Sequence, residues 1–226
     1  MIIGSGMIAS CLKSSDLKHD DLIIVACGVP NSQETRMSEY ERELESLTDL
    51  QQFYLGTDKK LIYFSSTSVN ESPYSYYPTH KLNVERFIEK NFENHLIIRL
   101  PILVGANNEN QLLGFLSKKL KNDEPVNITL NQNKHLIDVN DLPKIIQILV
   151  KTTFKKINVA FDNQISVVGI VDILEAIFKK RFSSKCFDDS RKESIIIDNT
   201  DFINLIGKEK NNFNTNPEKI ISKHYS

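Results

Sequence analysis

Two stretches of the chain decide its fold and its chemistry: Tyr63-Phe64-Ser65-Ser66-Thr67-Ser68-Val69 and Tyr77-Pro78-Thr79-His80-Lys81. The first continues an apolar run that begins at Leu61, and this run predicts a buried strand whose C-terminal end carries hydroxyl groups. The second opens an amphipathic helical pattern. Because Tyr77 and Lys81 are four residues apart, a helix places them on one face, one turn apart.

This arrangement favours proton-transfer chemistry. A phenol has an ordinary pKa of about 10, and a neighbouring ammonium group favours its ionised form. Tyr77 is therefore a candidate general base for a hydroxyl or general acid for a carbonyl, and Ser66 can hydrogen-bond the same oxygen. A surface tyrosine and lysine on an ordinary helix would show the same spacing. Their position just after a strand that ends in Ser-Ser-Thr favours catalysis.

The composition excludes several classes of protein. The chain has 226 residues, of which 25% are charged, and a net charge of −1. We therefore expect no nucleic-acid partner and no anionic-membrane partner. Apolar runs such as Leu22 to Cys27 and Ile145 to Val150 are far shorter than the ~20 residues that span a bilayer.

The cysteines and the N-terminal residues indicate a cytoplasmic protein. Three widely spaced cysteines, never in a C-x-x-C pair, predict reduced thiols and no metal site. The five histidines show no metal-ligand spacing either. Met1 leads directly into a short apolar strand and a glycine turn, which leaves no room for a signal peptide.

That glycine turn, Gly4-Ser5-Gly6-Met7-Ile8-Ala9, follows the strand at residues 1–3 and opens a helix through about Lys13. Such a G-x-G-x-x-A turn lets the backbone approach a pyrophosphate at a helix N-terminus. Glycines at a strand–helix junction are also needed for the turn alone, so the signal is specific only in an α/β context.

The next connection is too short for a complete dinucleotide-binding domain. Only residues 14–21 separate the first helix from a second buried strand that runs from Leu22 to Gly28. A complete domain would place two further strands and their helices here, although one crossover alone needs at least ~10–12 residues. Asp20 and Asp21 have about the right distance from the glycines to bind a ribose, but they precede a different strand. We therefore expect a truncated adenosine site.

The rest of the chain alternates between strand and helix patterns. Helices are predicted over about 35–52, 76–91, 110–121, 167–180 and 216–224. Ser166 is the predicted N-cap of the helix at 167–180, and Asn140 is the predicted N-cap of a further helix that follows it. Strands are predicted at 60–66, 95–100, 126–130, 134–139 and 157–161. This order predicts an α/β fold: a Rossmann-like parallel sheet that lacks the usual second and third strands, with a small C-terminal α+β part. We expect residues 1–105 to form the shortened dinucleotide-binding part. Residues 106–226 would form the substrate-binding part, with some elements returning to the sheet.

Taken together and in order, the motifs resemble the extended short-chain dehydrogenase/reductase family, in particular its nucleotide-sugar epimerase/dehydratase branch. The matching segments are the glycine turn, Ala26-Cys27-Gly28, the S-S-x-x-V strand end at 65–69, the Y-x-x-x-K pair, Arg99 to Gly105, His135 to Asp141, Ile157-Asn158-Val159 and the segment from Asp198 to Gly207. The resemblance runs from one end of the chain to the other.

The resemblance implies a role for each matching position. It assigns catalysis to Ser66, Tyr77 and Lys81, with substrate contacts at Thr67 and His135. The implied cofactor is NAD or NADP, with a weakened adenosine site. The residues assigned to cofactor binding are Gly4, Gly6, Met7, Ile8, Ala26, Cys27, Gly28, Tyr77, Lys81 and Pro101. The implied activity is that of an oxidoreductase or epimerase acting on a nucleotide-activated sugar, with surface polysaccharide synthesis as its pathway. The family commonly forms homodimers through helices that correspond to 35–52 and 76–91.

Departures from the family leave two alternatives open. Thr67-Ser68 stands where dehydratases usually have Asp-Glu, which speaks against dehydration and leaves epimerisation or keto-reduction. Lys134-His135 replaces an arginine that would meet a substrate phosphate. One alternative is a non-enzymatic relative that has lost dinucleotide binding and serves as a binding or regulatory subunit. The other is an enzyme that uses the same Tyr-Lys pair on a carbonyl compound without a nucleotide.

Overall fold

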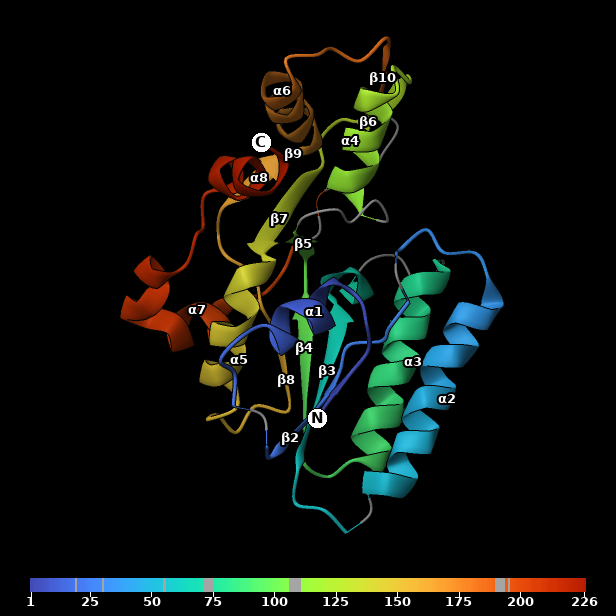
Figure 1. Ribbon diagram of the computed structural model, residues 1–226, viewed down its shortest axis with the longest axis vertical. Coiled ribbons are helices and arrows are strands. Elements are labelled where there is room, and N and C mark those ends of the chain that lie inside the picture. Colours follow the sequence, from blue (N-terminus) through green and yellow to red (C-terminus); the bar gives the residue numbers. More distant parts are fainter. Residues whose placement is uncertain are drawn as a thin grey trace. The chain divides into compact units, whose positions relative to one another are not determined.

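The computed structural model describes residues 1–18, 20–29, 31–54, 56–70, 75–105, 111–189, 194 and 196–226. The chain divides into two compact units (Figure 1). Unit 1 consists of Met1–Leu100 and Leu142–Val159, and unit 2 consists of Pro101–Asp141 and Ala160–Ser226. Within the described part of the chain, no helix is both long and apolar enough to cross a membrane.

Unit 1 is built on a five-stranded parallel sheet in the order β1-β2-β3-β4-β8. Its strands are β1 (Ile2–Ile3), β2 (Leu22–Val25), β3 (Lys60–Ser66), β4 (His95–Leu100) and β8 (Lys156–Asn158). β1 therefore pairs directly with β2 and lies at the edge of the sheet. This order confirms the predicted Rossmann-like sheet without its usual second and third strands.

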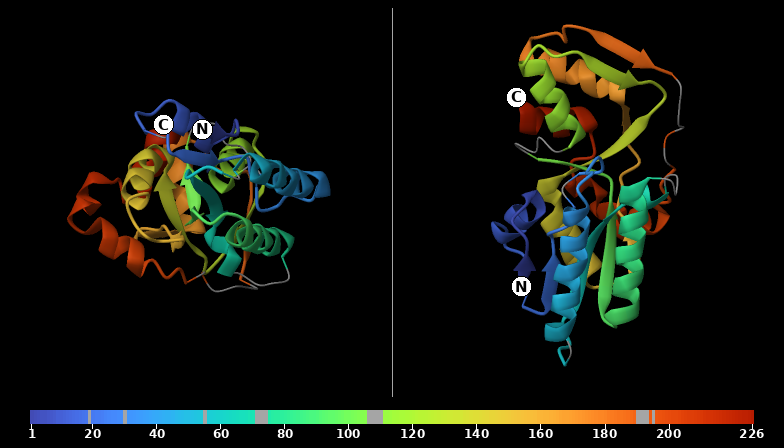
Figure 2. Two further views of the ribbon diagram at one scale, coloured as in Figure 1. Left: turned by 90° about the horizontal axis from the view of Figure 1, so that it is seen from below. Right: turned by 90° about the vertical axis from the view of Figure 1, so that its right-hand side faces the viewer.

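Helices cover both faces of this sheet. Figure 2 shows α2 (Met37–Tyr54) and α3 (Tyr76–Asn91) on one face, with α1 (Met7–Lys13) and α5 (Leu142–Leu149) on the other. β2, β3 and β4 consist largely of buried apolar residues, as expected for strands covered on both sides. Alternate residues such as Ile23, Leu61 and Ile97 pack against α2 and α3. This core fixes the strand ends from which the candidate site projects.

The connection from β3 to α3 carries the two stretches that decide the chemistry. β3 ends at Ser66 and continues into a 3-10 helix, η1 (Thr67–Asn70). α3 begins at Tyr76, so Pro78 lies in its first turn, where a missing N–H removes no helical hydrogen bond. The sequence predicts the same bounds for β3 and α3 as the structure shows.

Unit 2 contains two small sheets. One has the order β5-β7-β9, formed by β5 (Ile102–Val104), β7 (Asn133–Asp138) and β9 (Gln164–Ser166), and the other pairs β6 (Val126–Thr129) with β10 (Lys185–Asp188). Its helices are α4 (Leu112–Lys121), α6 (Val167–Phe178), α7 (Thr200–Ile206), α8 (Pro217–Tyr225) and the 3-10 segments η2 (Val139–Asp141) and η3 (Gly207–Asn212). α4, α6 and α8 share one apolar core with β6 and β7.

The sequence predicts two helix caps in the second half of the chain, and the structure shows one of them. Ser166 caps α6 as predicted, because its hydroxyl accepts a hydrogen bond from the Gly169 N–H at 3.0 Å. The predicted cap at Asn140 is wrong. α5 begins only at Leu142, after η2, and the Asn140 N–H instead donates to Asp138 Oδ1 at 3.0 Å. The side-chain acceptor at the start of this segment is therefore the Asp138 carboxylate and not the Asn140 amide.

Candidate active site

The predicted site residues of unit 1 gather at one edge of its sheet. The glycine turn follows β1, Ala26-Cys27-Gly28 follows β2, and Ser66 ends β3. Because all strands of this sheet run in parallel, these C-terminal ends share one edge, where ligands of open α/β sheets bind. Tyr77 and Lys81 come from the first turns of α3, which follows β3.

The two glycines of the turn have different roles. Gly4 has a φ of +126°, and a Cβ there would lie 2.2 Å from the Ala26 carbonyl oxygen, so the fold itself requires glycine. Gly6 precedes α1 with an ordinary φ of −74°, and a Cβ there would meet no atom of the described residues within 4 Å. Gly6 therefore faces open space, which a phosphate group can enter. Met7 and Ile8 follow it in the first turn of α1, and both are half-buried.

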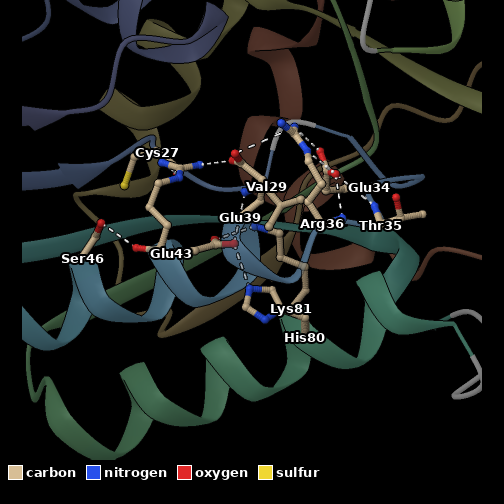
Figure 3. A network of polar contacts seen from close by, with 11 residues as sticks. Cys27, Val29, Glu34, Thr35, Arg36, Glu39, Glu43, Ser46, His80 and Lys81 are labelled. Atoms are coloured by element: carbon tan, nitrogen blue, oxygen red, sulfur yellow. Dashed lines mark hydrogen bonds and ion pairs between the residues drawn. The ribbon is translucent and has the colours of Figure 1, made fainter.

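A buried ion pair joins α2 to α3 beside this edge (Figure 3). The Lys81 ammonium donates to Glu43 Oε1 at 2.8 Å, and the two side chains are 3% and 0% exposed. The Tyr63 hydroxyl donates to the same oxygen at 2.6 Å and accepts from Lys81 Nζ at 2.8 Å. The other carboxylate oxygen lies 3.0 Å from His80 Nε2 and accepts from the Val29 N–H at 3.2 Å. Both Glu43 oxygens are thus satisfied without water.

The charges of this network are mutually dependent. Burial by itself raises the pKa of the Glu43 carboxyl, but Lys81 and the hydrogen bonds from His80 and Tyr63 hold that pKa well below its ordinary value. Burial lowers the pKa of Lys81, but Glu43 more than offsets it, so the pKa is raised. Burial and the adjacent carboxylate raise the pKa of Tyr63 well above its ordinary value. At neutral pH, Glu43 and Lys81 are therefore both ionised and Tyr63 is neutral.

The structure brings Tyr77 and Lys81 together as the spacing predicts. The half-buried Tyr77 ring has its centroid 5.7 Å from Lys81 Nζ, and the Tyr63 ring has its centroid 5.0 Å from the same nitrogen. An ammonium group has three N–H donors, and Glu43 and Tyr63 use two of them. Among the residues that the structure describes, the third donor has no acceptor, so it is available to a ligand.

Gly28 is the residue that makes room for the ion pair. A Cβ at Gly28 would lie 2.8 Å from both Glu43 Oε1 and Lys81 Nζ. The neighbouring Cys27 is half-buried, and burial together with Glu43 raises the pKa of its thiol, so the thiol is neutral at pH 7. The small residues after β2 thus let the two charges approach the sheet edge closely.

The hydroxyl of Ser66 is bound within its own turn. Its oxygen lies 2.9 Å from Ser68 Oγ and accepts from the Ser68 N–H at 3.1 Å. Ser66 remains half-buried, whereas Thr67, predicted to contact substrate, is only 4% exposed.

Two predicted site residues belong to unit 2. His135 is 7% exposed, its Nδ1 lies 2.7 Å from the Phe161 carbonyl oxygen, and its Nε2 lies 2.9 Å from Gln164 Nε2. Both ring nitrogens are thus engaged inside that unit, in the tautomer that donates from Nδ1. Pro101 is half-buried between β4 and β5. The substrate role of His135 and the cofactor role of Pro101 stay predictions.

Glu43, Tyr63 and His80 are the members of the site that sequence reasoning missed. A signal for Glu43 exists in the helical pattern, because the buried stripe of α2 runs through Tyr40, Glu43, Leu47 and Leu50. A carboxylate on an otherwise apolar stripe must find a partner inside the protein. The pattern alone does not show which partner it finds.

Comparisons with known proteins bear on the family. Residues 56–162 match the family described as the RmlD substrate binding domain. No protein of curated function matches the chain.

Many solved structures share the fold, among them the following three, each below 20% sequence identity. The structure of MoeE5 in complex with UDP-glucose and NAD has a TM-score of 0.75 at 17% identity, over 95% of this chain and 82% of that chain. UDP-glucuronic acid 4-epimerase from Bacillus cereus, in complex with UDP-glucuronic acid and NAD, has a TM-score of 0.72 at 17% identity, over 98% and 77%. TunA, an NAD-dependent NDP-hexosamine 5,6-dehydratase involved in tunicamycin biosynthesis, has a TM-score of 0.71 at 16% identity, over 89% and 74%.

The family match over residues 56–162 and the shared fold of these solved structures agree with the resemblance found in the sequence. They confirm the predicted Rossmann-like α/β fold. At these identities the neighbours establish the fold, and the chemistry rests on the residues of this chain.

Proposed function

We propose that the chain is an NAD(P)-dependent enzyme that epimerises or reduces a nucleotide-activated sugar in surface polysaccharide synthesis. The observation that carries this proposal is the pair formed by Tyr77 and Lys81, with the ammonium 5.7 Å from the centre of the phenol ring. The pair lies at the end of the parallel sheet where ligands bind in this fold class. Structural neighbours that include a nucleotide-sugar epimerase and a dehydratase support the proposal.

Each residue has a distinct role in this proposal. Tyr77 exchanges a proton with the reacting oxygen of the sugar, and the ammonium group of Lys81 lies beside its ring. Ser66 orients the same oxygen through its hydroxyl, which is already fixed in place by Ser68. Thr67 and His135 contact the substrate.

The residues present fit the nicotinamide half of the cofactor. The open space at Gly6, followed by Met7 and Ile8, suits a phosphate, and the remaining N–H of Lys81 suits a ribose hydroxyl. Gly4, Ala26, Cys27, Gly28 and Pro101 complete the proposed cofactor contacts. When bound, the nicotinamide ring supplies hydride transfer, which no side chain provides.

A matched pair of variants tests the role of Tyr77. Tyr77→Phe removes one hydroxyl and keeps the ring, and Tyr76→Phe makes the same change at the exposed neighbouring residue. With a sugar substrate found by screening, we expect Tyr77→Phe to lower turnover by about 10²–10⁴-fold and Tyr76→Phe to leave it unchanged. Both variants should unfold at the wild-type temperature. A Tyr77→Phe protein with full activity would contradict the proposal.

A second candidate function is a non-enzymatic binding or regulatory subunit that has lost dinucleotide binding. Two observations favour it: β1 lies at the edge of the sheet, and Lys81 is bound to Glu43. Calorimetric titration of the protein with NAD(H) and NADP(H) separates the two functions. Micromolar binding supports the enzyme, and no binding at millimolar concentration supports the subunit.

A further inference from the structure

The edge position of β1 has a consequence for cofactor recognition. β1 pairs on one side with β2, through bonds from Ile24 N to Met1 O (2.9 Å) and from Ala26 N to Ile3 O (2.8 Å). In a complete dinucleotide-binding sheet, two further strands lie on the other side and hold the adenosine. Here α1 and β2 are separated by residues 14–21 alone, fewer than the ~10–12 that one crossover needs.

The acidic residues nearest in sequence cannot replace the missing ribose ligand. Asp20 and Asp21 precede β2, and their backbone carbonyls accept from Lys59 Nζ at 2.6 Å and from the Lys60 N–H at 2.9 Å. Lys60 is the first residue of β3. Both aspartates therefore lie at the N-terminal edge of the sheet, opposite the edge that carries Gly6.

The groups that remain all serve the nicotinamide side of a pyridine nucleotide. Within the described part of the chain, Gly6 offers open space for the phosphate, and Lys81 has one N–H that no acceptor occupies. We infer that this site binds the nicotinamide mononucleotide half of the cofactor and does not recognise the adenosine half. The inference rests on the proposed function and narrows it: the 2′-phosphate that distinguishes NADP from NAD goes unrecognised.

The experiment measures the affinity of the full chain for three reduced nucleotides: NADH, NADPH and nicotinamide mononucleotide (NMNH). Titrations followed by nicotinamide fluorescence or calorimetry should give dissociation constants that agree within about threefold. A charged hydrogen bond to the adenosine ribose would instead separate them by about tenfold to a hundredfold.

The outcomes separate this inference from the proposed function. Binding of all three nucleotides with similar affinity supports both. A dinucleotide that binds at least about tenfold more tightly than NMNH, or a similar gap between NADH and NADPH, overturns the inference and leaves the proposed enzyme standing. If none of the three binds, the inference and the proposed function both fail.

Variants show whether NMNH binds where the inference places it. Gly6→Asp and Gly6→Asn introduce side chains of equal size into open space, at a helix-capping position that favours both residues. Only the aspartate repels a phosphate, so we expect it to weaken NMNH binding at least about tenfold more than the asparagine does. The double variant Asp20→Asn/Asp21→Asn should keep wild-type affinity for NADH. Equal effects of the two Gly6 variants, or weaker NADH binding by the double variant, would overturn the inference.

Discussion

Replacing Glu43 with glutamine isolates the charge of the buried pair. Glutamine keeps the size of the side chain and one oxygen acceptor, but it leaves the Lys81 ammonium without a counter-ion in the core. Glu43 is 0% exposed and Lys81 3%, so solvent does not replace the lost charge. The structure therefore predicts a large loss of stability from a change of one atom.

The magnitude follows from the 2.8 Å separation between Lys81 Nζ and Glu43 Oε1. At an effective dielectric constant of ~20, two unit charges at this distance attract each other by about 6 kcal/mol. The variant can limit its loss by deprotonating Lys81, which at pH 7 costs about 4.6 kcal/mol from an ordinary pKa of ~10.4. We therefore expect the free energy of unfolding to fall by about 3–5 kcal/mol at pH 7, as for other broken buried pairs.

Urea unfolding, followed by circular dichroism at several pH values, measures this loss. Deprotonating Lys81 costs only about 1.9 kcal/mol at pH 9, so the gap between Glu43→Gln and wild type should narrow as the pH rises. Glu39→Gln is the matched control on the same helix. Its carboxylate pairs with Arg42 at 2.9 Å, and the two side chains are 23% and 46% exposed, so a loss below about 1 kcal/mol is expected. A Glu43→Gln loss equally small, or independent of pH, would refute the reasoning.

Three further predictions concern stability. The pKa of Glu43 is lower in the folded state than in the unfolded state, so ionised Glu43 stabilises the fold above about pH 4.3, and this stabilisation is lost as the pH falls. The free energy of unfolding of the wild type should therefore fall more on acidification than that of Glu43→Gln. Gly28→Ala places a Cβ 2.8 Å from two charged atoms and should cost about 1–3 kcal/mol in urea unfolding, whereas Gly6→Ala, in open space, should cost less than about 1 kcal/mol. The Asp138 carboxylate lies 2.7 Å from Lys223 Nζ and 2.9 Å from His224 Nε2, and both residues belong to α8. Asp138→Asn weakens these contacts, so amide hydrogen exchange in α8 should accelerate while that in α3 stays unchanged.

Elements with a strong local signal could be predicted from the sequence. The bounds of α3 follow from its amphipathic period and from Pro78 in the first turn, and β3 follows from an apolar run that stops at hydroxyl residues. The missing strands beside β1 also follow from the sequence, because a short connection limits what it can contain. By contrast, β9 and β10, with three and four residues, are too short to show a period.

The ion pair beside Tyr77 could not be predicted, because it depends on how two helices pack. α2 carries four glutamates at alternate positions, Glu39, Glu41, Glu43 and Glu45, and glutamate side chains are mostly exposed to solvent. Only the approach of α3 brings Lys81 and His80 to one of the four. Sequence reasoning likewise placed Lys81 beside Tyr77 but did not show that a carboxylate and a second phenol would occupy most of its donors.

A crystal structure of the protein grown with NADH tests the central claim most directly. We expect the nicotinamide ribose about 3 Å from Lys81 Nζ, on the donor that Glu43 and Tyr63 leave unused, with the nicotinamide ring beside the Tyr77 hydroxyl. The contact between Lys81 and Glu43 should persist in that complex. If NADH at saturating concentration leaves the site empty, or binds without touching Lys81, then Tyr77 and Lys81 are not the centre of a nicotinamide-dependent active site.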